Sequence, residues 1–420
     1  MDKRAEGGGR KPMSRREFLK ISGGFALSLP STKLPKNKVE LSPIKKELTV
    51  STTDELLQAI HQMEEDPNVP YKLILSGETY SISTRKNVDV PYAHEPNRRR
   101  VSHSANLVFP ARELEITGLE GKKPIIEFQN GADISMYFSD AHRVMLRGLD
   151  IRVQKPRGIT IENITPSILF VAGVPHESND VVIQDCALID GTSVLQKYRN
   201  SGITTVGVEK VRVKGSSIQS CYDGIAGFGC VDMKVERSQV LRPKESAFSM
   251  GTGIVLIPYK GQTSPNLVIN EVELCNFMKS FGMLGDNIKS GIIFADGVYF
   301  TEYIRNNGYF NDGFGRWLCC RGGCKVTLKG INMSSAEARR QLVVDYETLI
   351  IFNSYLRTIV KDFLPLPNNN VKPTITNSSI DYCFDKDGFF KLPDLKYLEE
   401  MGFRVRNIRS FKEKPLVVIP

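Results

Sequence analysis

One pattern of apolar and polar positions recurs from residue 114 to residue 380. The pattern spans eight positions. Positions 1 and 3 are apolar, position 6 is small or apolar, position 8 is apolar, and the other four positions vary. Val144-x-Leu146-x-x-Leu149-x-Ile151 is a typical copy. Successive copies start between 22 and 37 residues apart, which indicates a repeat architecture. The ten copies begin at Leu114, Val144, Val181, Val211, Met233, Leu267, Ile292, Val326, Leu349 and Pro373.

Alternation with a period of two predicts a strand with one buried face. The two variable positions inside each copy shift that phase, so we expect the chain to turn a corner there between two short strands. A small residue fits such a corner. We name the two strands of a copy the middle strand and the trailing strand. A third apolar run, the leading strand, precedes most copies, at Ser135–Phe138, Ile168–Ala172, Ile203–Val206, Ile254–Tyr259 and Gln341–Val344.

Three short strands in each unit form one coil, and stacked coils place equivalent residues about 4.8 Å apart. This organisation resembles the right-handed parallel β-helix of the pectate-lyase-like superfamily over residues 48–385. The resemblance implies an all-β, single-stranded solenoid of three sheets and about ten coils with an N-terminal capping helix. The alternative is a leucine-rich solenoid, but the chain contains no L-x-x-L-x-L repeat.

Both ends of the predicted solenoid carry the covers that an open stack of coils needs. Thr52 and Glu55 form a capping-box pattern, and apolar residues then recur at helical spacing. The segment 73–80 resembles the first-coil entry of polysaccharide-active β-helices. Residues 394–401 predict a short C-terminal helix. We therefore divide the chain into a leader and linker at 1–47, a β-helix at 48–390 and a capping segment at 391–420.

Charge is concentrated at the N-terminus. The net charge of the 420 residues is +9, of which residues 1–50 contribute 12 − 5 = +7 and the remainder 44 − 42 = +2. A nearly neutral body lacks the positive field that non-specific nucleic-acid binding needs, so we expect no nucleic-acid partner. No apolar stretch approaches the length of a membrane span, so we expect none in the mature chain. We expect the mature protein to be a monomer.

The basic leader contains a short motif followed by a weakly apolar run over residues 21–29. The motif resembles the twin-arginine (Tat) export signal, which implies a bacterial periplasmic or secreted protein and the Tat translocase as a partner during export. The alternative is a disordered basic tail with a chance motif. Its six matching positions are Ser14, Arg15, Arg16, Phe18, Leu19 and Lys20.

The eight cysteines do not form a spaced disulfide framework. Cys319, Cys320 and Cys324 are the only tight cluster, and no further Cys or His lies nearby in the sequence to complete a zinc or iron–sulfur site. We therefore expect small apolar side chains in a core, and no metal site at these cysteines.

Irregular spacing of the copies indicates where a binding site could lie. Longer units carry their extra residues between a trailing strand and the next leading strand, at 152–167, 189–202, 241–253 and 300–315. Insertions in a solenoid map to one face, which is often the binding face. We expect these loops to wall a groove beside the leading strands. The polar stretch 83–105 either adds to that rim or is a solvated excursion.

The insertion that starts at residue 300 is rich in aromatic residues and contains the only Trp. Aromatic faces stack on the apolar surface of sugar rings, and Tyr and Trp retain a polar group. The alternative is that these aromatics pack the loop against the solenoid. The predicted substrate-binding residues are Tyr303, Arg305, Tyr309 and Trp317.

Alignment of the coils places charged residues at the ends of four consecutive leading strands: Lys260, Asp286, Arg321 and Asp345. We predict that these four are catalytic. Lys260, its pKa lowered by Arg321 or by burial, could act as a base, and Arg321 could bind a substrate carboxylate. Asp286 and Asp345 could hold a bridging Ca²⁺ or orient the two cations. The alternative is a surface ladder of weak salt bridges.

The leading hypothesis is an exported carbohydrate-active protein that binds a polysaccharide, most simply a lyase that cleaves a uronate-containing glycan by β-elimination. The alternatives are a glycoside hydrolase or uronate epimerase on the same fold, or a non-catalytic glycan-binding or envelope protein. The adjacent Asp-Asp and the Gly-His-Gly of polygalacturonase-type hydrolases are absent from the sequence. A P-loop or a serine-nucleophile motif is also absent.

Overall fold

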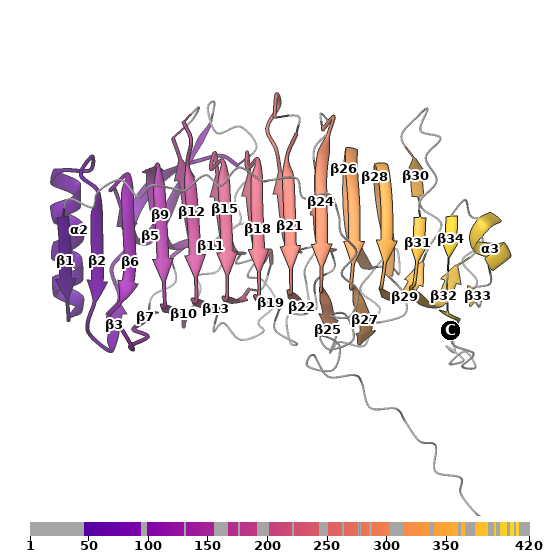
Figure 1. The fold of residues 1–420 in the computed structure, drawn as a ribbon. Coiled ribbons are helices and arrows are strands. Elements are labelled where there is room, and N and C mark those ends of the chain that lie inside the picture. Colours follow the sequence, from indigo (N-terminus) through magenta and orange to yellow (C-terminus); the bar gives the residue numbers. More distant parts are fainter. Residues whose placement is uncertain are drawn as a thin grey trace, which may run out of the picture.

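The chain forms a tube of stacked β-strand coils in a computed structural model (Figure 1). Each coil contributes one strand to each of three parallel ladders, and the strands of a ladder pair with those of the preceding and following coils. One coil runs from β8 (Ile134–Ala141) through β9 (Arg143–Arg147) to β10 (Asp150–Val153). The described residues are 46–93, 99–129, 132–154, 167–174, 177–190, 201–220, 222–242, 251–262, 264–275, 277, 279–284, 288–301, 315–335, 340–359, 363–365, 374–384, 390–391, 395–400, 404–406 and 409–410.

The leading ladder is made of the strands that precede the sequence repeat. Its first strand, β5, pairs antiparallel with β4 and parallel with β8. The ladder contains β4 (Lys86–Pro91), β5 (Arg100–Phe109), β8, β11 (Ser167–Gly173), β14 (Ser201–Val206), β17 (Ile225–Phe228), β20 (Thr252–Ile257), β23 (Lys279–Met283), the first parts of β26 (Gly315–Lys329) and β28 (Arg340–Phe352), and β30 (Phe363–Pro365).

The middle ladder is continuous with the leading ladder near the C-terminus, because β26 and β28 run through the corner between the two with a register shift between Cys320 and Cys324. It contains β1 (Lys46–Val50), β2 (Tyr71–Leu75), β6 (Glu113–Gly118), β9, β12 (Asp180–Gln184), β15 (Lys210–Lys214), β18 (Asp232–Glu236), β21 (Asn266–Asn270), β24 (Gly291–Asp296), the second parts of β26 and β28, β31 (Thr374–Thr376) and β34 (Arg404–Arg406).

The trailing ladder is a separate sheet. It contains β3 (Thr79–Ile82), β7 (Ile125–Phe128), β10, β13 (Ala187–Asp190), β16 (Ser217–Gln219), β19 (Gln239–Leu241), β22 (Glu273–Cys275), β25 (Tyr299–Thr301), β27 (Asn332–Ser335), β29 (Tyr355–Ile359), β32 (Ser379–Phe384), β35 (Arg409–Ser410) and the antiparallel β33 (Phe390–Lys391). The predicted three-sheet parallel β-helix is confirmed, and its stack continues beyond residue 390 through β34 and β35.

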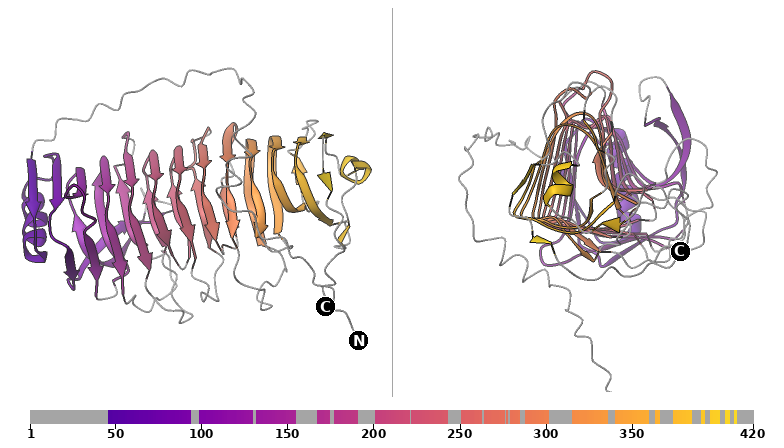
Figure 2. Two further views of the ribbon diagram at one scale, coloured as in Figure 1. Left: turned by 60° about the horizontal axis from the view of Figure 1, so that its bottom comes forward. Right: turned by 90° about the vertical axis from the view of Figure 1, so that its right-hand side faces the viewer.

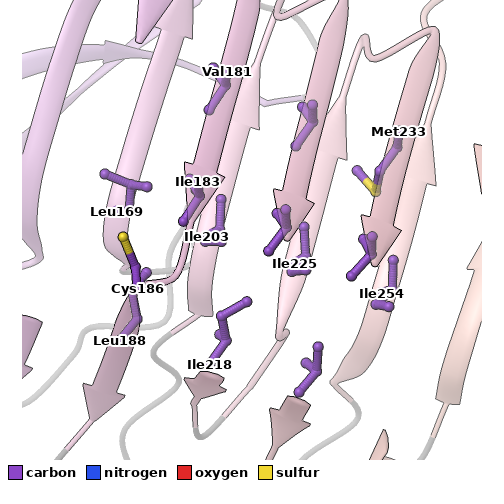
Figure 3. Close-up of a cluster of buried hydrophobic side chains, with 14 of the residues drawn as sticks. Leu169, Val181, Ile183, Cys186, Leu188, Ile203, Ile218, Ile225, Met233 and Ile254 are labelled. Carbon is purple, nitrogen blue, oxygen red and sulfur yellow. The ribbon is translucent and has the colours of Figure 1, made fainter. Parts of the chain in front are cut away.

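The interior of the tube is filled by rows of stacked apolar side chains (Figure 3). In the leading ladder, Leu169, Ile203, Ile225 and Ile254 pair in register and are fully buried. Most of the alternating residues that the repeat predicts as inward-facing are buried in the same cluster; Leu119 and Ile292 are exposed instead. Burial of each such side chain stabilises the fold by about 1.5–3 kcal/mol. The core therefore has no single centre and extends along the whole described tube.

The corner between middle and trailing strands is made by one residue with a positive φ angle in each coil. The second variable position of the repeat adopts φ between 47° and 64° in nine coils, at Gly148, Asp185, Gly215, Arg237, Glu271, Gly297, Gly330, Asn353 and Asn377. This left-handed conformation turns the strand through the corner. The position after the left-handed residue is small in some coils and apolar in others, and the apolar Leu149, Val272 and Ile331 are buried there.

Where serine follows the left-handed residue, its hydroxyl takes part in the corner's hydrogen bonding. The Ser216 hydroxyl donates to the Lys214 carbonyl at 3.0 Å and accepts from the Cys186 backbone N–H at 3.2 Å. Ser238 does the same one coil later, since its hydroxyl accepts from the Ser216 backbone N–H. Ser354 and Ser378 repeat the arrangement. These bonds satisfy backbone donors that would otherwise be buried without a partner.

One copy of the repeat lies one residue away from its predicted frame. The prediction started that copy at Ile292, which is 48% exposed, whereas Ile293 is fully buried and pairs with Leu267. The sequence from 292 to 300 is apolar enough to alternate in either frame. Gly297, with φ of 64°, sets the corner and hence the register. The inward-facing residues are Ile293, Ala295, Val298 and Phe300.

Both ends of the core are covered. Helix α2 (Thr53–Glu65) begins after Thr52, whose hydroxyl accepts from the Glu55 backbone N–H at 3.2 Å, and the Glu55 carboxylate accepts from Ser51. Helix α2 buries Leu56, Ala59, Ile60 and Met63 against the first coil. At the other end, Leu398 of helix α3 (Leu395–Glu400) is buried in the same core. None of the described helices is long and apolar enough to cross a membrane.

Candidate functional site

The outer face of the leading ladder differs from the outer face of the middle ladder. On the middle ladder, the outward-facing Arg212 and Lys234 are 37% and 38% exposed. On the leading ladder, Tyr137, Phe170 and Thr204 pair in register on the outer face and are nearly inaccessible to solvent. Val255, further along the same outward row, is also buried. Something other than the tube wall therefore covers this face.

The cover over its N-terminal part is the hairpin of β4 and β5. Val90 is fully buried, and it forms with Ala93 a second apolar cluster on the outside of the tube. Figure 2 shows the hairpin outside the coils in the end-on view. Its partners on the outer faces of β8, β11 and β14 are Ile134, Tyr137, Phe170, Ala172 and Val206. The polar stretch 83–105 is thus a docked hairpin and not a solvated excursion.

A small polar cluster joins the hairpin to β8. The Asp133 carboxylate accepts from the backbone N–H and the hydroxyl of Ser104, both at 2.9 Å. His103 Nδ1 lies 3.5 Å from the same carboxylate oxygen. Hydrogen bonding with His103 is the main cause that lowers the pKa of Asp133; the bonds from Ser104 add to it and burial opposes it. His94 and Arg98 of the same stretch lie outside the described residues.

Tyr137 is the ring at the centre of the covered face. It packs edge-on against Phe170 with ring centroids 5.8 Å apart. Burial raises the pKa of Tyr137 to about 12, opposed by the charge of Arg100 on the hairpin. The hydroxyl is therefore neutral at every physiological pH and is not a base. The covered face contributes packing rather than acid–base groups.

Polar groups replace apolar ones in the central coils. The hydroxyls of Ser167 and Thr204 are 2.6 Å apart, and the Asp223 carboxylate accepts from the Thr252 backbone N–H at 2.6 Å. Ser167, Ser201 and Thr204 are all nearly fully buried. These groups therefore mark a transition along one face, from apolar to polar.

Charged residues appear on the leading strands of three coils near the C-terminus. Lys279 of β23 pairs in register with Arg316 of β26, and Gly315 pairs with Arg340 of β28. Arg321 and Asp345 each follow directly after the paired Cys320 and Val344. Strands β11, β14, β17 and β20 contain no Asp, Glu, Lys or Arg. The leading ladder therefore concentrates positive charge at its C-terminal end.

The four predicted catalytic residues do not share one register position. Lys260 lies in a turn four residues beyond Leu256, whereas Arg321 lies one residue beyond Cys320 of the same row. The side chain of Lys260 is exposed, so burial does not remove water from its ammonium group. Arg321 and Asp345 directly follow Cys320 and Val344, which pair, but the register shifts between Cys320 and Cys324, so the two are not themselves a register pair. Asp286 lies outside the described residues.

Of the predicted substrate-binding residues, the structure describes the backbone of one. Trp317 lies within β26, at the register shift between the pairs Arg316–Gln341 and Leu318–Leu342, and so is part of the wall and not of a loop. Tyr303, Arg305 and Tyr309 lie outside the described residues, as do the leader motif and its Arg15–Arg16 pair. Phe300, from the same aromatic stretch, is a core residue of β25 and is 1% exposed.

The four insertions all leave the tube at one corner. Each lies between a trailing strand and the next leading strand, at β10–β11, β13–β14, β19–β20 and β25–β26. This confirms that the extra residues join the coil beside the leading ladder. The hairpin and the insertions are thus attached to the same side of the tube.

Sequence reasoning missed Lys279, Arg316 and Arg340. These three lie at or next to the starts of the leading strands, whereas the predicted charged residues follow their ends. The signal was available: the strands before residue 260 have hydroxyl or apolar residues at the positions that pair with Lys279 and Arg316. Comparing starts as well as ends would have found them.

The middle ladder carries charges of a different kind. Glu113, Arg143, Asp180, Lys210 and Asp232 pair in register on successive strands, so the sign of the charge alternates at every coil. Arg212 forms an ion pair with Asp232 at 3.0 Å. Burial raises the pKa of Asp180, opposed by the charges of Arg212 and Arg143. Charges that neutralise one another along a half-exposed row stabilise weakly and attract no particular ligand.

Neither the cysteines nor the carboxylates form a metal site in the described part of the chain. It contains no group of three or more His, Cys, Asp or Glu side chains that could hold a metal ion. Cys186, Cys230, Cys275 and Cys324 are buried, and Cys324 Sγ lies 3.8 Å from Met283 Sδ in the core. Asp345, a predicted Ca²⁺ ligand, lies in β28 directly after Val344, which pairs with Cys320. We derive no step through Ca²⁺.

Comparison of the chain with models of known protein families finds no match. A search of curated proteins likewise finds none.

Proposed function

We propose that this protein is an exported carbohydrate-active enzyme that binds an acidic polysaccharide along the C-terminal part of the leading ladder and cleaves it by β-elimination. The observation that carries this proposal is the set of cations on three consecutive strands, Lys279, Arg316, Arg321 and Arg340, against one carboxylate, Asp345, in the same strand segments. The bacterial envelope destination rests on the twin-arginine motif in the leader.

The spacing of these cations suits a polymer of regularly repeated anions. Neighbouring strands of a parallel ladder are about 4.8 Å apart, so each coil offers a cation at a regular interval along the tube. Arginine binds carboxylates with two parallel hydrogen bonds, which adds orientation to attraction. The neutralised charge row of the middle ladder lacks this property. A uronate polymer is the glycan class whose charge matches such a row.

In the proposed reaction, Arg321 binds the carboxylate of one uronate and withdraws charge from the adjacent carbon. A base takes the proton from that carbon, the electron pair forms a carbon–carbon double bond, and the glycosidic C–O bond on the next carbon breaks. The leaving oxygen takes up a proton, so atoms and charge balance. Lys260, exposed in the turn after β20, is the candidate base, and Asp345 beside Arg321 is the candidate that orients it.

The test is a screen of the purified protein against a panel of uronic-acid polymers, with and without added Ca²⁺. A lyase generates an unsaturated product that absorbs in the ultraviolet. Reducing ends without that absorbance would identify a hydrolase, a changed uronate composition without chain cleavage would identify an epimerase, and retention on the glycan without any product would identify a binding protein. Each of these three outcomes contradicts the lyase.

Alanine variants test whether the reaction takes place at the leading ladder. Lys260→Ala and Arg321→Ala are each expected to lower kcat/KM by about a hundredfold or more, the range of general acid–base and charge-stabilising groups. Lys234→Ala is the matched control, because Lys234 is a partly exposed cation on the middle ladder and pairs only with Glu236 in a 3.0 Å ion pair. Wild-type rates in both leading-ladder variants would remove these residues from the mechanism.

A further inference from the structure

We infer that the outer face of the middle ladder from β18 to β31 is an interface through which two copies of this protein form a weak dimer. The face lies on a different ladder from the proposed catalytic residues, so this inference does not depend on the proposed function. A dimer differs from the monomer expected from the sequence. Figure 1 shows the strands of the face side by side along the tube: β18, β21, β24, the second parts of β26 and β28, and β31.

Apolar side chains are exposed on this face. In the described residues, the exposed large apolar side chains are Leu119 at 42%, Ile292 at 48% and Ile350 at 38%. Ile292 of β24 and Ile350 of β28 both point outward from this face. Apolar side chains gathered on one exposed sheet face are typical of a protein–protein contact. The outward row that contains Ile350 pairs in register along all six strands: Lys234, Val268, Phe294, Thr327, Ile350 and Thr374.

The next outward row carries one ion pair at its centre. Asp296 of β24 pairs in register with Lys329 of β26, and the Lys329 ammonium lies 2.6 Å from the Asp296 carboxylate. The positions before and after this pair in the row are uncharged, since they hold Asn270 of β21 and Phe352 of β28. The face therefore combines an apolar strip with a single pair of opposite charges on adjacent strands.

These two rows complement themselves under a two-fold axis. The axis lies between β24 and β26, runs along the strands and sits midway between two facing copies. Each residue then faces a residue of the same row on the second copy. Val268 faces Ile350 of the second copy, and Asp296 faces Lys329 of the second copy. A self-complementary surface of this kind forms a closed dimer, and its opposite charges attract across the interface.

The charge pattern favours a second copy over a polyanion such as a uronate polymer. A polyanion carries charge of one sign, so it is repelled by Asp296 wherever it is attracted by Lys329. A second copy offers both signs in reversed order. The same axis places the exposed Ile292 opposite Lys325 of the second copy, whose aliphatic stem can cover an apolar side chain.

The predicted contact is small. Five strand spacings and about five residues along each strand give a face of roughly 24 Å by 16 Å, or about 400 Å² on each copy. Stable complexes bury about 800 Å² on each partner. Beyond the six strands, Arg212 of β15 would face Arg404 of the second copy, and these like charges limit the contact. The two copies should therefore associate reversibly and weakly.

Sedimentation velocity of the purified protein over a series of concentrations tests the inference. The expected result is a reversible equilibrium between monomer and dimer, with the dimer fraction rising at micromolar concentrations and above. A protein that stays monomeric at every concentration up to about 1 mM would overturn the inference. Loss of uronate binding by such a monomer on Ile350→Glu would assign the face to the glycan instead.

Charge variants test which residues face each other. Val268→Lys and Ile350→Glu each place an uncompensated charge opposite an apolar side chain, and each is expected to raise the dimer dissociation constant about tenfold or more. The double variant pairs the new charges between copies and is expected to restore the dimer. Within one copy the two positions are three strands apart, roughly 14 Å, so the restored attraction acts between copies.

Leu119→Glu is the matched control, because Leu119 is an exposed apolar residue outside this face. It is expected to leave the dissociation constant unchanged. A dimer that neither single variant weakens, or that the double variant does not restore, would overturn the inferred arrangement. Circular dichroism checks that each variant folds, and if one does not, the concentration series of the wild-type protein still decides whether a dimer forms.

Discussion

Two stretches of the leading ladder share one inner wall and differ in their outer face. In β8, β11 and β14 the outer positions hold Tyr137, Phe170 and Val206, all buried under the hairpin. In β26 and β28 the corresponding ends of the strands hold Arg321 and Asp345. The inner positions in both stretches are aliphatic or aromatic and stack in register, as Leu169 and Phe281 do.

This difference shows that the inward-facing rows determine the fold, whereas the outward-facing rows can vary with function. A coil is stabilised by its inward side chains and its ladder hydrogen bonds, neither of which depends on what faces out. One stretch of the face therefore became a docking surface for the chain's own hairpin. The other could accumulate cations at no cost to the core.

The largest expected effect comes from the covered stretch. Phe170→Ala removes a fully buried ring from beneath the hairpin and is expected to lower the free energy of unfolding by about 3–5 kcal/mol. Denaturant unfolding measures it. Lys234→Ala on the middle ladder serves as the control, with an expected change within about 0.5 kcal/mol. A loss below about 1 kcal/mol for Phe170→Ala would mean that the hairpin does not cover the ring as described.

The cationic stretch should respond in binding and not in stability. Arg316→Ala is expected to weaken binding of a uronate polymer by roughly ten- to a hundredfold, the value of one hydrogen-bonded charge pair, with no change in unfolding. Isothermal titration at low and high salt measures it, because the wild-type affinity should fall with ionic strength. Equal affinities of the wild type and Arg316→Ala would exclude this position from the glycan contact.

The same Thr→Val substitution at two adjacent positions of β14 distinguishes the outer face from the inner wall. Thr204 points outward and its hydroxyl lies 2.6 Å from that of Ser167. Thr205 points inward, and its buried hydroxyl has no hydrogen-bond partner in the described part of the chain. Thr204→Val is expected to destabilise by about 1 kcal/mol and Thr205→Val to stabilise by a similar amount. Equal signs for the two changes would contradict the assignment of inner and outer faces.

The smallest expected effect is a pH dependence of the hairpin's polar link. The pKa of Asp133 is lowered in the folded protein, mainly by hydrogen bonding with His103. Its contribution to stability is therefore complete above the ordinary carboxyl pKa of about 4, and is lost as the pH falls through the lower folded value. Wild-type unfolding measured at about pH 5 and about pH 2 should converge towards that of Asp133→Asn. A constant difference across this range would show that the link does not titrate.

The repeat predicted the fold because a period of two and a regular spacing are local properties. Two of the ten copies depart from the structure. Leu119 of the first copy is exposed, and the copy started at Ile292 is one residue out of frame because neighbouring residues are apolar in both frames. The information that resolved it was a left-handed Gly297, which is a backbone property and not a hydrophobic one. The hairpin was not predicted because its apolar residues, such as Val90, pack against the outer surface of other coils and not into the core of the tube.

The candidate site was only partly predictable. Arg321 and Asp345 were predicted as neighbours because both follow apolar runs of equal length. They directly follow Cys320 and Val344, which pair in register, whereas Lys260 lies in a turn whose length the alignment did not count. Lys279 and Arg316 were missed because their partnership depends on register across an insertion, from 302 to 314, that separates them in the sequence.

By itself the sequence determined that this chain forms a three-sided stack of short strands with covered ends, because alternation of apolar residues and helix capping act over a few residues. Only the tertiary structure decided which outer face is covered, which frame the ambiguous coil adopts and which charges become neighbours. The physical reason is that neighbours across a rung are 20 to 37 residues apart along the chain, as Arg212 and Asp232 or Ser167 and Thr204 are. Their proximity is set by the length of every coil between them.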